Sequence, residues 1–389
     1  MDSKSKHFPF KVCCKRKKYS FALSTKFIYK HLVRKTEIKV LKAFEGDCII
    51  IHTFDTDGNC FNILLDGGTP GTFKKSLRKE LEYFKEEKLS IDLLILTHID
   101  NDHIGGILIF IESSLFDKIE VKKYFFNGGN LIRIKEGTQV SANQGLEFEK
   151  YLLAKEKDRK KWGDKVVFTA EEIKLANGII CKILSPDEKG LELLLANWKY
   201  LSDEEIQSYQ VAGSVVTKAK DFDISFNELV KRDFNPDKSL EEDYFNNSSI
   251  AFILECPDFK GLFLGDTCPE TIITSLKGFG YSKENPLQLD LVKVSHHGSK
   301  NNTSNELLEL IQCKKFVITT NGNGKGSTKH PDRETIARIV AQPNISNPKD
   351  IQVNFNYTKE GIENKIGKFI TDNEDKTYNF VFNTEIITN

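Results

Sequence analysis

The chain has 389 residues, of which 39% are hydrophobic and 29% charged, and its 56 Lys and Arg side chains balance 56 Asp and Glu side chains. This is the composition of an ordinary globular protein. No stretch approaches the roughly 18 consecutive apolar residues of a transmembrane helix, which excludes a membrane-spanning chain. There is no clear secretory signal, and eight Cys without a CxxC pattern fit reduced thiols. We therefore expect a cytoplasmic protein without a membrane partner.

The charge is unevenly distributed along the chain. Residues 1–36 hold nine Lys and two Arg against one Asp, a net charge of 11 − 1 = +10, so the remainder carries −10. We expect a basic N-terminal extension over residues 1–36, followed by a main domain over residues 37–389. The extension could bind nucleic-acid phosphates or could be a tail with no partner. The sequence leaves both alternatives open.

The first predicted elements are strands. Residues 37–44 and 48–54, separated by Glu45, Gly46 and Asp47, predict a β-hairpin, and residues 59–68 predict a third strand that ends in a glycine turn. The apolar run of residues 91–97 predicts a strand buried on both faces. Further elements predicted in this half are a helix over 73–88, a helix over 104–116 and a strand with a turn over 122–129.

The second half repeats this alternation after a less regular region. We expect an insertion over residues 131–245, with helices over 145–161 and 204–210, a strand pair around 178–186 and a polar loop over 213–245. The elements predicted after it are strands over 249–256, 261–267, 289–299, 315–322, 351–357 and 377–383, and helices over 305–312 and 332–341. Strands alternating with helices indicate an α/β layered domain.

Histidine and aspartate gather where apolar strands end. His98 and Asp100 follow the run 91–97, and residues two apart in extended chain point the same way, so both can meet one ion. Asp102 and His103 would turn toward a second ion. Asp266 ends another apolar strand, and the pair His296 and His297 ends a third. A polar turn with a helix cap would explain the segment 98–103 alone, but not the three strand ends together. We predict a pocket with about two metal sites, with His296 favoured over His297 as the ligand.

These motifs carry a family resemblance. With Asp66 in "LLDGG", "HIDNDH", "FLGD" and "HHGS", the chain resembles the metallo-β-lactamase-fold hydrolases over about residues 37–357. The H-x-D-x-D-H variant is similar to the soluble metallo-β-lactamase domain of the ComEC/Rec2 competence proteins. The resemblance implies an α/β fold, an αββα sandwich of two mixed β-sheets flanked by helices. It also implies that Asp66 is a structural residue near the site.

The resemblance also implies two divalent ions, zinc or manganese, with Asp266 bridging them. The family's intermediate His is missing, and Asn247 and Ser248 are the nearest candidates for its place. The first site would then be rich in oxygen ligands, which favours Mn²⁺ or Mg²⁺ over Zn²⁺. Occupancy of the second site alone is the alternative.

The expected reaction follows from these ligands. A metal-bound hydroxide would be the nucleophile, and Asp102 would orient it. By resemblance, His330 and Asn321 lie near the pocket, where His330 could bind a phosphate oxygen or protonate the leaving group, or each could be structural. Ser299 could hold phosphate, whereas Cys268 is expected to point away from the ions.

The leading hypothesis is a metal-dependent hydrolase of phosphodiesters, acting on nucleic acid as a nuclease or on a nucleotide. The first alternative is a hydrolase of carboxylic esters, lactones or thioesters on the same fold. The second is a binding or regulatory module weakened by the missing His. A basic rim around the pocket would favour the nuclease, and an apolar rim the lactonase. Protein partners are unknown from the sequence.

Overall fold

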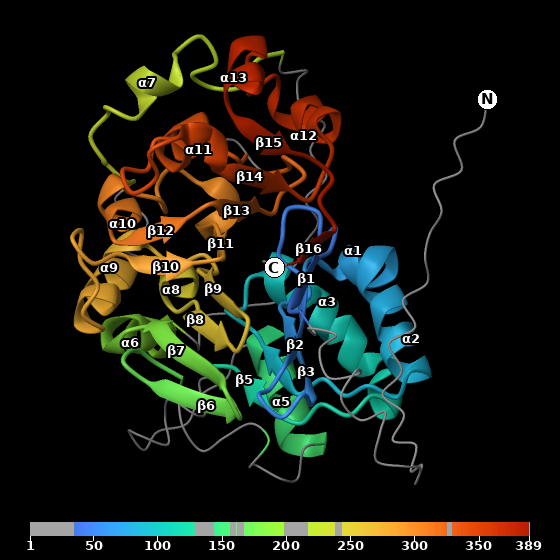
Figure 1. Cartoon of the computed structure of the whole chain (residues 1–389). Helices are drawn as coiled ribbons and strands as arrows, with labels where there is room; N and C mark the ends of the chain where they lie inside the picture. Colours follow the sequence, from blue (N-terminus) through green and yellow to red (C-terminus); the bar gives the residue numbers. More distant parts are fainter. Residues whose placement is uncertain are drawn as a thin grey trace, which may run out of the picture.

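The computed structural model describes residues 35–128, 144–155, 161, 167–197, 217–237, 243–324 and 329–388. Nearly all of the expected basic extension, and the helix expected over 204–210, lie outside these residues. Within them, two mixed β-sheets pack face to face with helices on their outer faces, so the αββα sandwich is confirmed (Figure 1).

The first sheet has the strand order β16-β1-β2-β3-β4-β5. The predicted hairpin is confirmed, because β1 (Glu37–Val40) pairs antiparallel with β2 (Ile49–Phe54). The next strands are β3 (Cys60–Leu65), β4 (Leu93–Ile95) and β5 (Tyr124–Phe125), and they pair in parallel. Strand β16 (Ile386–Thr388), which the sequence did not predict, pairs with β1.

The second sheet has the order β15-β14-β13-β11-β9-β8-β7-β6. Its antiparallel half consists of β6 (Glu172–Ala176), β7 (Ile179–Ser185), β8 (Ala251–Cys256) and β9 (Phe259–Phe263). Its parallel half continues from β9 through β11 (Leu291–Lys293), β13 (Lys315–Ile318), β14 (Gln352–Phe355) and β15 (Asn379–Val381). Strands β6 and β7 lie within the range expected for the insertion and form the edge of this sheet.

Helices cover both outer faces. Those beside the first sheet are α1 (Pro70–Thr72), a π-helical turn (Phe73–Leu77), α2 (Arg78–Glu86), α3 (Asn101–Glu112) and α5 (Gln144–Lys155). The remaining helices are α6 (Glu188–Asn197), α7 (Phe226–Leu229), α8 (Tyr244–Asn247), α9 (Pro269–Gly278), α10 (Asn305–Glu309), α11 (Arg333–Val340), α12 (Lys359–Ile366) and α13 (Asp372–Thr377). Helix α10 is shorter than predicted, because β12 (Ile311–Cys313) pairs with β10 (Leu287–Leu289) instead of continuing the helix.

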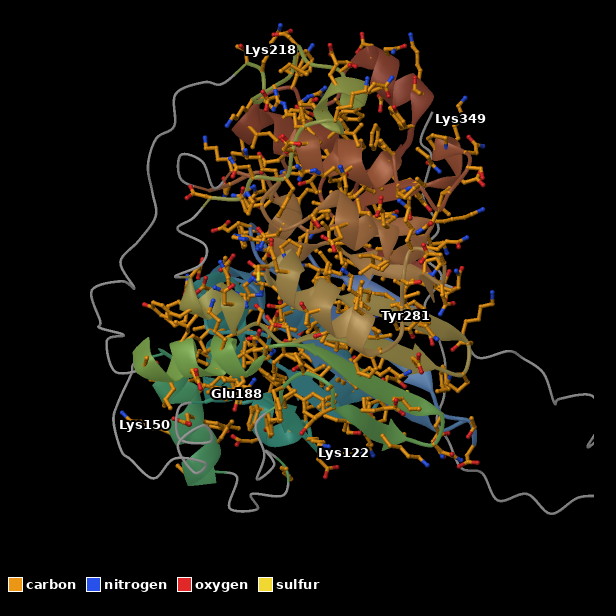
Figure 2. The ribbon with its side chains drawn as sticks, turned by 90° about the vertical axis from the view of Figure 1, so that its left-hand side faces the viewer. Lys122, Lys150, Glu188, Lys218, Tyr281 and Lys349 are labelled. Carbon is orange, nitrogen blue, oxygen red and sulfur yellow. The ribbon has the colours of Figure 1, made fainter. Side chains whose placement is uncertain are left out.

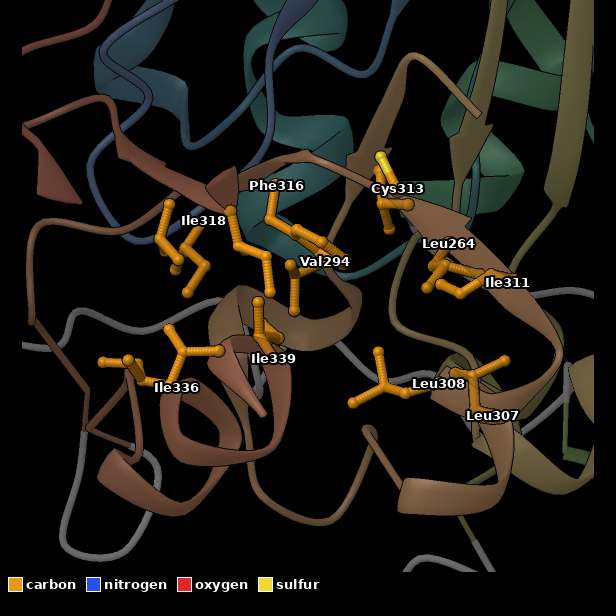
Figure 3. Close-up of a cluster of buried hydrophobic side chains, with 14 of the residues drawn as sticks. Leu264, Val294, Leu307, Leu308, Ile311, Cys313, Phe316, Ile318, Ile336 and Ile339 are labelled. Atoms are coloured by element: carbon orange, nitrogen blue, oxygen red, sulfur yellow. The ribbon is translucent and has the colours of Figure 1, made fainter. Parts of the chain in front are cut away.

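Central strands such as β4 and β13 are buried on both faces, as predicted for residues 91–97. In β4, Leu93 and Ile95 pack between the two sheets, whereas Leu94 packs against the helices. In β13, Phe316 and Ile318 face α11, where they lie near Ile336 and Ile339 (Figure 3). Charged side chains such as Lys122, Glu188 and Lys349 lie on the outside of the molecule (Figure 2). Burial on both faces fixes the register of the strands, and so fixes where their ends lie.

Candidate metal centre

Parallel pairing brings the predicted residues to one edge of the sandwich. Strands β9 and β11 are parallel neighbours, so Asp266 and His297 follow strands that end side by side. His98 follows β4 in the other sheet, and Asp102 and His103 lie in the first turn of α3. The Oδ2 atom of Asp266 lies 3.5 Å from Nε2 of His103 and 3.5 Å from Nε2 of His297. The two sheets thus contribute to one cluster.

Two overlapping groups of side chains could hold metal ions. The potential ligand atoms of His98, His103 and Asp266 lie within 4.8 Å of one another, and so do those of Asp102, His103 and His297. The Oδ2 atom of Asp100 lies 3.7 Å from Nε2 of His98, as expected for side chains two apart. Similarly, Oδ2 of Asp102 lies 3.3 Å from Nε2 of His297.

Buried polar atoms in the cluster fit a bound cation. Within the described part of the chain, no hydrogen-bond partner is found for Nε2 of His98, Nε2 of His103, Nε2 of His297 or Oδ1 of Asp266. A buried polar atom without a partner costs free energy, and this cost would be removed by a divalent ion bound among these nitrogens and oxygens. The residues present therefore suit a metal site.

Hydrogen bonds at the opposite ring nitrogens hold the three imidazoles. The Nδ1 atom of His98 lies 3.0 Å from both Thr97 Oγ1 and Ser249 Oγ. His103 donates from Nδ1 to Asp66 Oδ2 at 2.8 Å, and His297 donates from Nδ1 to the Thr319 carbonyl at 2.9 Å. Such partners fix the tautomer and orient each ring, so that Nε2 faces the cluster. Asp66 acts here on His103, and it also accepts hydrogen bonds from the Thr97 amide and hydroxyl.

The charges within the cluster influence one another. Burial opposes ionisation of Asp266, but the adjacent histidines outweigh it and hold the pKa of this carboxyl well below its ordinary value. Burial also opposes ionisation of Asp102, yet His103 and His297 lower its pKa. The pKa of His98 is well below its ordinary value because of burial. These are the protonation states that a metal ligand needs. Three ligands are exceptions. Burial opposes the charged form of His103 and His297, but the surrounding carboxylates outweigh it and raise the pKa of each ring. Burial, together with the charge of Asp102, raises the pKa of the Asp100 carboxyl. A bound cation would replace these protons.

The two adjacent histidines have different positions. Both have a positive φ, 45° at His296 and 53° at His297. His297 Nε2 reaches Asp102 and Asp266, whereas His296 Nε2 is 3.9 Å from Asp266 Oδ2 and its ring lies 5.3 Å from that of His330. The distances favour His297 over His296 as the ligand, the reverse of the preference drawn from the sequence.

The other predicted residues lie around the cluster. His330 is buried, and its Nδ1 lies 3.1 Å from Asp332 Oδ2. Ser299 is buried and donates from its amide to the His296 carbonyl at 2.9 Å. Asn321 donates from its amide to the Phe44 carbonyl, and its side-chain oxygen accepts a hydrogen bond from the Asn323 amide. These hydrogen bonds hold Asn321 within the loop that follows β13.

Asn247 and Ser248 were expected to take the place of the missing histidine, but Ser249 is the residue that contacts the cluster. The Ser248 hydroxyl donates to the Phe245 carbonyl, so it serves the end of α8. The next residue, Ser249, instead contacts His98 Nδ1 and accepts a hydrogen bond from the Asp266 amide at 3.2 Å. Asn247 and Cys268 line a cavity of about 350 Å³. Cys268 Sγ lies 3.6 Å from Thr271 Oγ1.

Sequence reasoning missed Asp47, Lys293, Thr97 and Ser249, which support the cluster. A lysine inside the apolar run "LDLVKV" was a signal, because a charge in a buried strand needs a partner. Asp243 was also missed. Burial raises the pKa of its carboxyl, and Asp266 adds to this despite hydrogen bonds from Asn246.

The sandwich of two sheets, with a cluster of His and Asp side chains at one edge, is consistent with the metallo-β-lactamase fold. Residues 44–173 match the sequence model of the Metallo-beta-lactamase superfamily. The chain is similar to ComE operon protein 3 of Bacillus subtilis (strain 168), at 21% identity over 332 residues, which cover 82% of this chain and 32% of that protein. The chain therefore spans about a third of the length of this curated relative.

Two solved structures are also similar to this chain. One is the metallo-beta-lactamase fold protein YhfI from Bacillus subtilis, with a TM-score of 0.40 and 9% identity, covering 92% of this chain and 100% of that one. The other is a long form RNase Z from yeast, with a TM-score of 0.38 and 15% identity, covering 91% of this chain and 41% of that one. Among the helices in the described residues, none has the length and apolar character needed to cross a membrane.

Proposed function

We propose that the protein hydrolyses phosphodiester bonds with divalent ions held in this cluster. The observation that carries the proposal is the position of Asp266, which forms a close group with His98 on one side and whose Oδ2 lies 3.5 Å from His297 Nε2 on the other. One carboxylate can therefore serve two neighbouring ions. Two ions held together suit an anionic centre with several oxygens better than a neutral amide.

The family resemblance implies two ligand sets, and the distances between the side chains support them. His98 and Asp100 would hold the first ion, Asp102, His103 and His297 the second, and Asp266 would be shared. When bound, the ions would lower the pKa of water to roughly 7 and polarise the scissile ester. The carboxylate of Asp100 makes the first set rich in oxygen, which favours Mn²⁺.

Two side chains would move protons. Ionised Asp102, 3.3 Å from His297 Nε2, would orient the attacking water. His330 would protonate the leaving group. Its Nδ1 faces Asp332, so Nε2 is the atom that would give the proton. The ring lies beside His296 at the rim of the cluster, where a substrate would arrive.

The cavity lined by Asn247 and Cys268 does not bear on the choice of substrate, because its lining includes none of the ligands of the cluster. Its charged side chains, those of Lys189, Asp187, Asp237 and Glu270, therefore do not define a substrate rim. Neutral esters, lactones and thioesters are the second candidate class.

The test compares the wild type with Asp102→Ala, each with Mn²⁺, Mg²⁺ or Zn²⁺, on single-stranded DNA, RNA, a small phosphodiester and a lactone panel. We expect the wild type to cleave the small phosphodiester fastest with Mn²⁺. Asp102→Ala should reduce turnover by about 10³-fold or more, because it removes a ligand and the group that orients the water. Its circular dichroism should be unchanged.

Asp223→Ala is the matched control, because that carboxylate pairs with Lys218 on the surface. It should keep full turnover. Cleavage of lactones alone, with every phosphodiester untouched in every metal, would overturn the proposal in favour of the second class.

A further inference from the structure

A buried ion pair lies between the two sheets beside the cluster. The side chain of Asp47 is 2% exposed and that of Lys293 is 1% exposed, and the Lys293 ammonium contacts Asp47 Oδ2. Asp47 belongs to the loop between β1 and β2 in the first sheet, and Lys293 ends β11 in the second. The pair therefore joins the sheets at the edge that carries the cluster.

One side of the pair contacts the second sheet's ligands. Lys293 Nζ donates to the Gly265 carbonyl at 3.4 Å, directly before Asp266. The Oδ1 atom of Asp47 accepts a hydrogen bond from the Thr319 hydroxyl and lies 3.6 Å from His297 Nδ1. Thr319 also supplies the carbonyl that accepts from His297 Nδ1. Asp47 thus contacts both the ring of His297 and the residue that orients it.

The other side fits against Asp102. The Asp47 amide donates to the Asp102 carbonyl at 3.2 Å. At Gly46 the approach is closer still, since a Cβ atom there would lie 1.7 Å from the Asp102 carbonyl oxygen. A single loop thereby places a ligand-bearing helix of the first sheet against a ligand-bearing turn of the second.

Stability alone does not explain a charge pair at this place. When a buried ion pair is replaced by apolar residues of similar volume, the stability of the protein often stays the same or increases. A role as metal ligand does not explain Asp47 either. It forms a third close group with Asp66 and His103, but the Lys293 ammonium already supplies a cation to its carboxylate.

We propose that Asp47 and Lys293 are positioning residues, which hold His297 and Asp102 in place for the second ion without contacting it. The inference rests on the proposed metal-dependent function. Partners that orient metal-binding histidines typically change metal affinity by about 10–100-fold when they are removed.

The experiment separates positioning from stability. The double variant Asp47→Asn with Lys293→Met removes both charges. Its thermal unfolding is measured in the presence of a chelator, and its binding of Mn²⁺ is measured by calorimetric titration. We expect an unfolding temperature near that of the wild type, because the double variant buries no unpaired charge. The affinity for one Mn²⁺ ion should fall about 10–100-fold, and the affinity for the other should change little. The absorption spectrum of the Co²⁺-loaded protein should change as well.

The matched control is Asp92→Asn with Lys122→Met. This pair, with Nζ and Oδ1 2.6 Å apart, lies where β4 begins, opposite the end that leads to His98. Its removal should leave both Mn²⁺ affinities unchanged. If the Asp47 double variant fails to fold, Thr319→Val removes the hydroxyl that contacts Asp47 without burying an unpaired charge, and should weaken the same Mn²⁺.

The outcomes distinguish this inference from the proposed function. Two bound Mn²⁺ ions with unchanged affinities, in the double variant or in Thr319→Val, would overturn the positioning role and leave the metal centre intact. A wild type that binds neither Mn²⁺ nor Zn²⁺ would overturn both.

Discussion

The side chain of Asp266 lies among three histidines of the cluster. Its Oδ2 faces His103, His296 and His297, and its Oδ1 is buried with no hydrogen-bond partner among the described residues. An ionised carboxylate in such a place needs positive charge close by. Histidines supply it in the metal-free protein, and the proposed ions would supply it in the loaded one.

Asp266→Ala should therefore abolish the binding of both ions. Metal content after loading with Mn²⁺, measured by mass spectrometry, is expected to fall from two ions per chain to none. Asp223→Ala serves as the control and should keep two. Unchanged stoichiometry in Asp266→Ala would refute the bridging role.

His330 separates proton transfer from metal binding. The proposed role predicts that His330→Ala reduces turnover of the phosphodiester about 10²–10⁴-fold. Metal content should not change, because His330 belongs to neither ligand group. Steady-state kinetics and metal analysis of the same preparation check this prediction. Turnover equal to that of the wild type would assign the ring a structural role.

At this scale the sequence indicated which residue types gather, but not how each side chain points. Alternation along a strand was the basis for pairing His98 with Asp100. It does not extend to His296 and His297, where positive φ values turn the backbone out of the extended conformation. The sequence pointed to Ser248, whereas the structure shows that Ser249 contacts His98. The two hydroxyls are adjacent in sequence, and only the turn after α8 decides which of them faces the cluster.

Helix α3 shows how one element carries the cluster. Asp102 and His103 lie in its first turn, so the position of the helix sets theirs. The helix packs closely on the turn after β3. A Cβ atom at Gly106 would lie 2.0 Å from the Gly67 carbonyl oxygen. The close approach requires glycine.

Gly106→Ala should push α3 away from this turn. We expect a loss of about 1–3 kcal/mol in the free energy of unfolding, together with weaker Mn²⁺ binding, because overpacking displaces the backbone. Gly278→Ala is the control, since no atom lies within 4 Å of a Cβ there. Chemical denaturation and Mn²⁺ titration of both variants test the prediction, and equal behaviour would contradict it.

The elements could be predicted where local pattern decides. The hairpin, β4 and α11 are marked by apolar periodicity or by an unbroken apolar run. Strand β12 could not be predicted, because residues 311–313 continue a helical pattern and only pairing with β10 makes them a strand. Strand β16 likewise depends on pairing with β1, a contact between the two ends of the main domain.

At the scale of the whole molecule, the cluster lies where the sheets meet. Its ligands follow β4 in the first sheet and β9 and β11 in the second, and the order of the motifs let the sequence predict this convergence. Lys293 within an apolar strand indicated that a partner was needed, but the sequence could not identify Asp47 as that partner, because the two residues lie 246 positions apart. Ions bound here would link the two halves of the sandwich.

Metal should therefore stabilise the fold. A ligand at 100 times its Kd adds about 2.7 kcal/mol to the free energy of unfolding. We expect Mn²⁺ to raise the Tm by several degrees over the chelated protein, measured by scanning calorimetry. Asp266→Ala should show no such shift. A wild-type Tm independent of Mn²⁺ would show that no ion links the sheets.

If the cluster cleaves phosphodiesters with bound metal, its activity must depend on the metal. The most direct measurement follows product release from a small chromogenic phosphodiester by one wild-type preparation, first as purified, then after chelation, then after addition of Mn²⁺. Chelation should abolish the activity, and addition of Mn²⁺ should restore it. Hydrolysis that persists unchanged in the fully chelated protein, or no hydrolysis with any of Mn²⁺, Mg²⁺ and Zn²⁺, would contradict the proposed function.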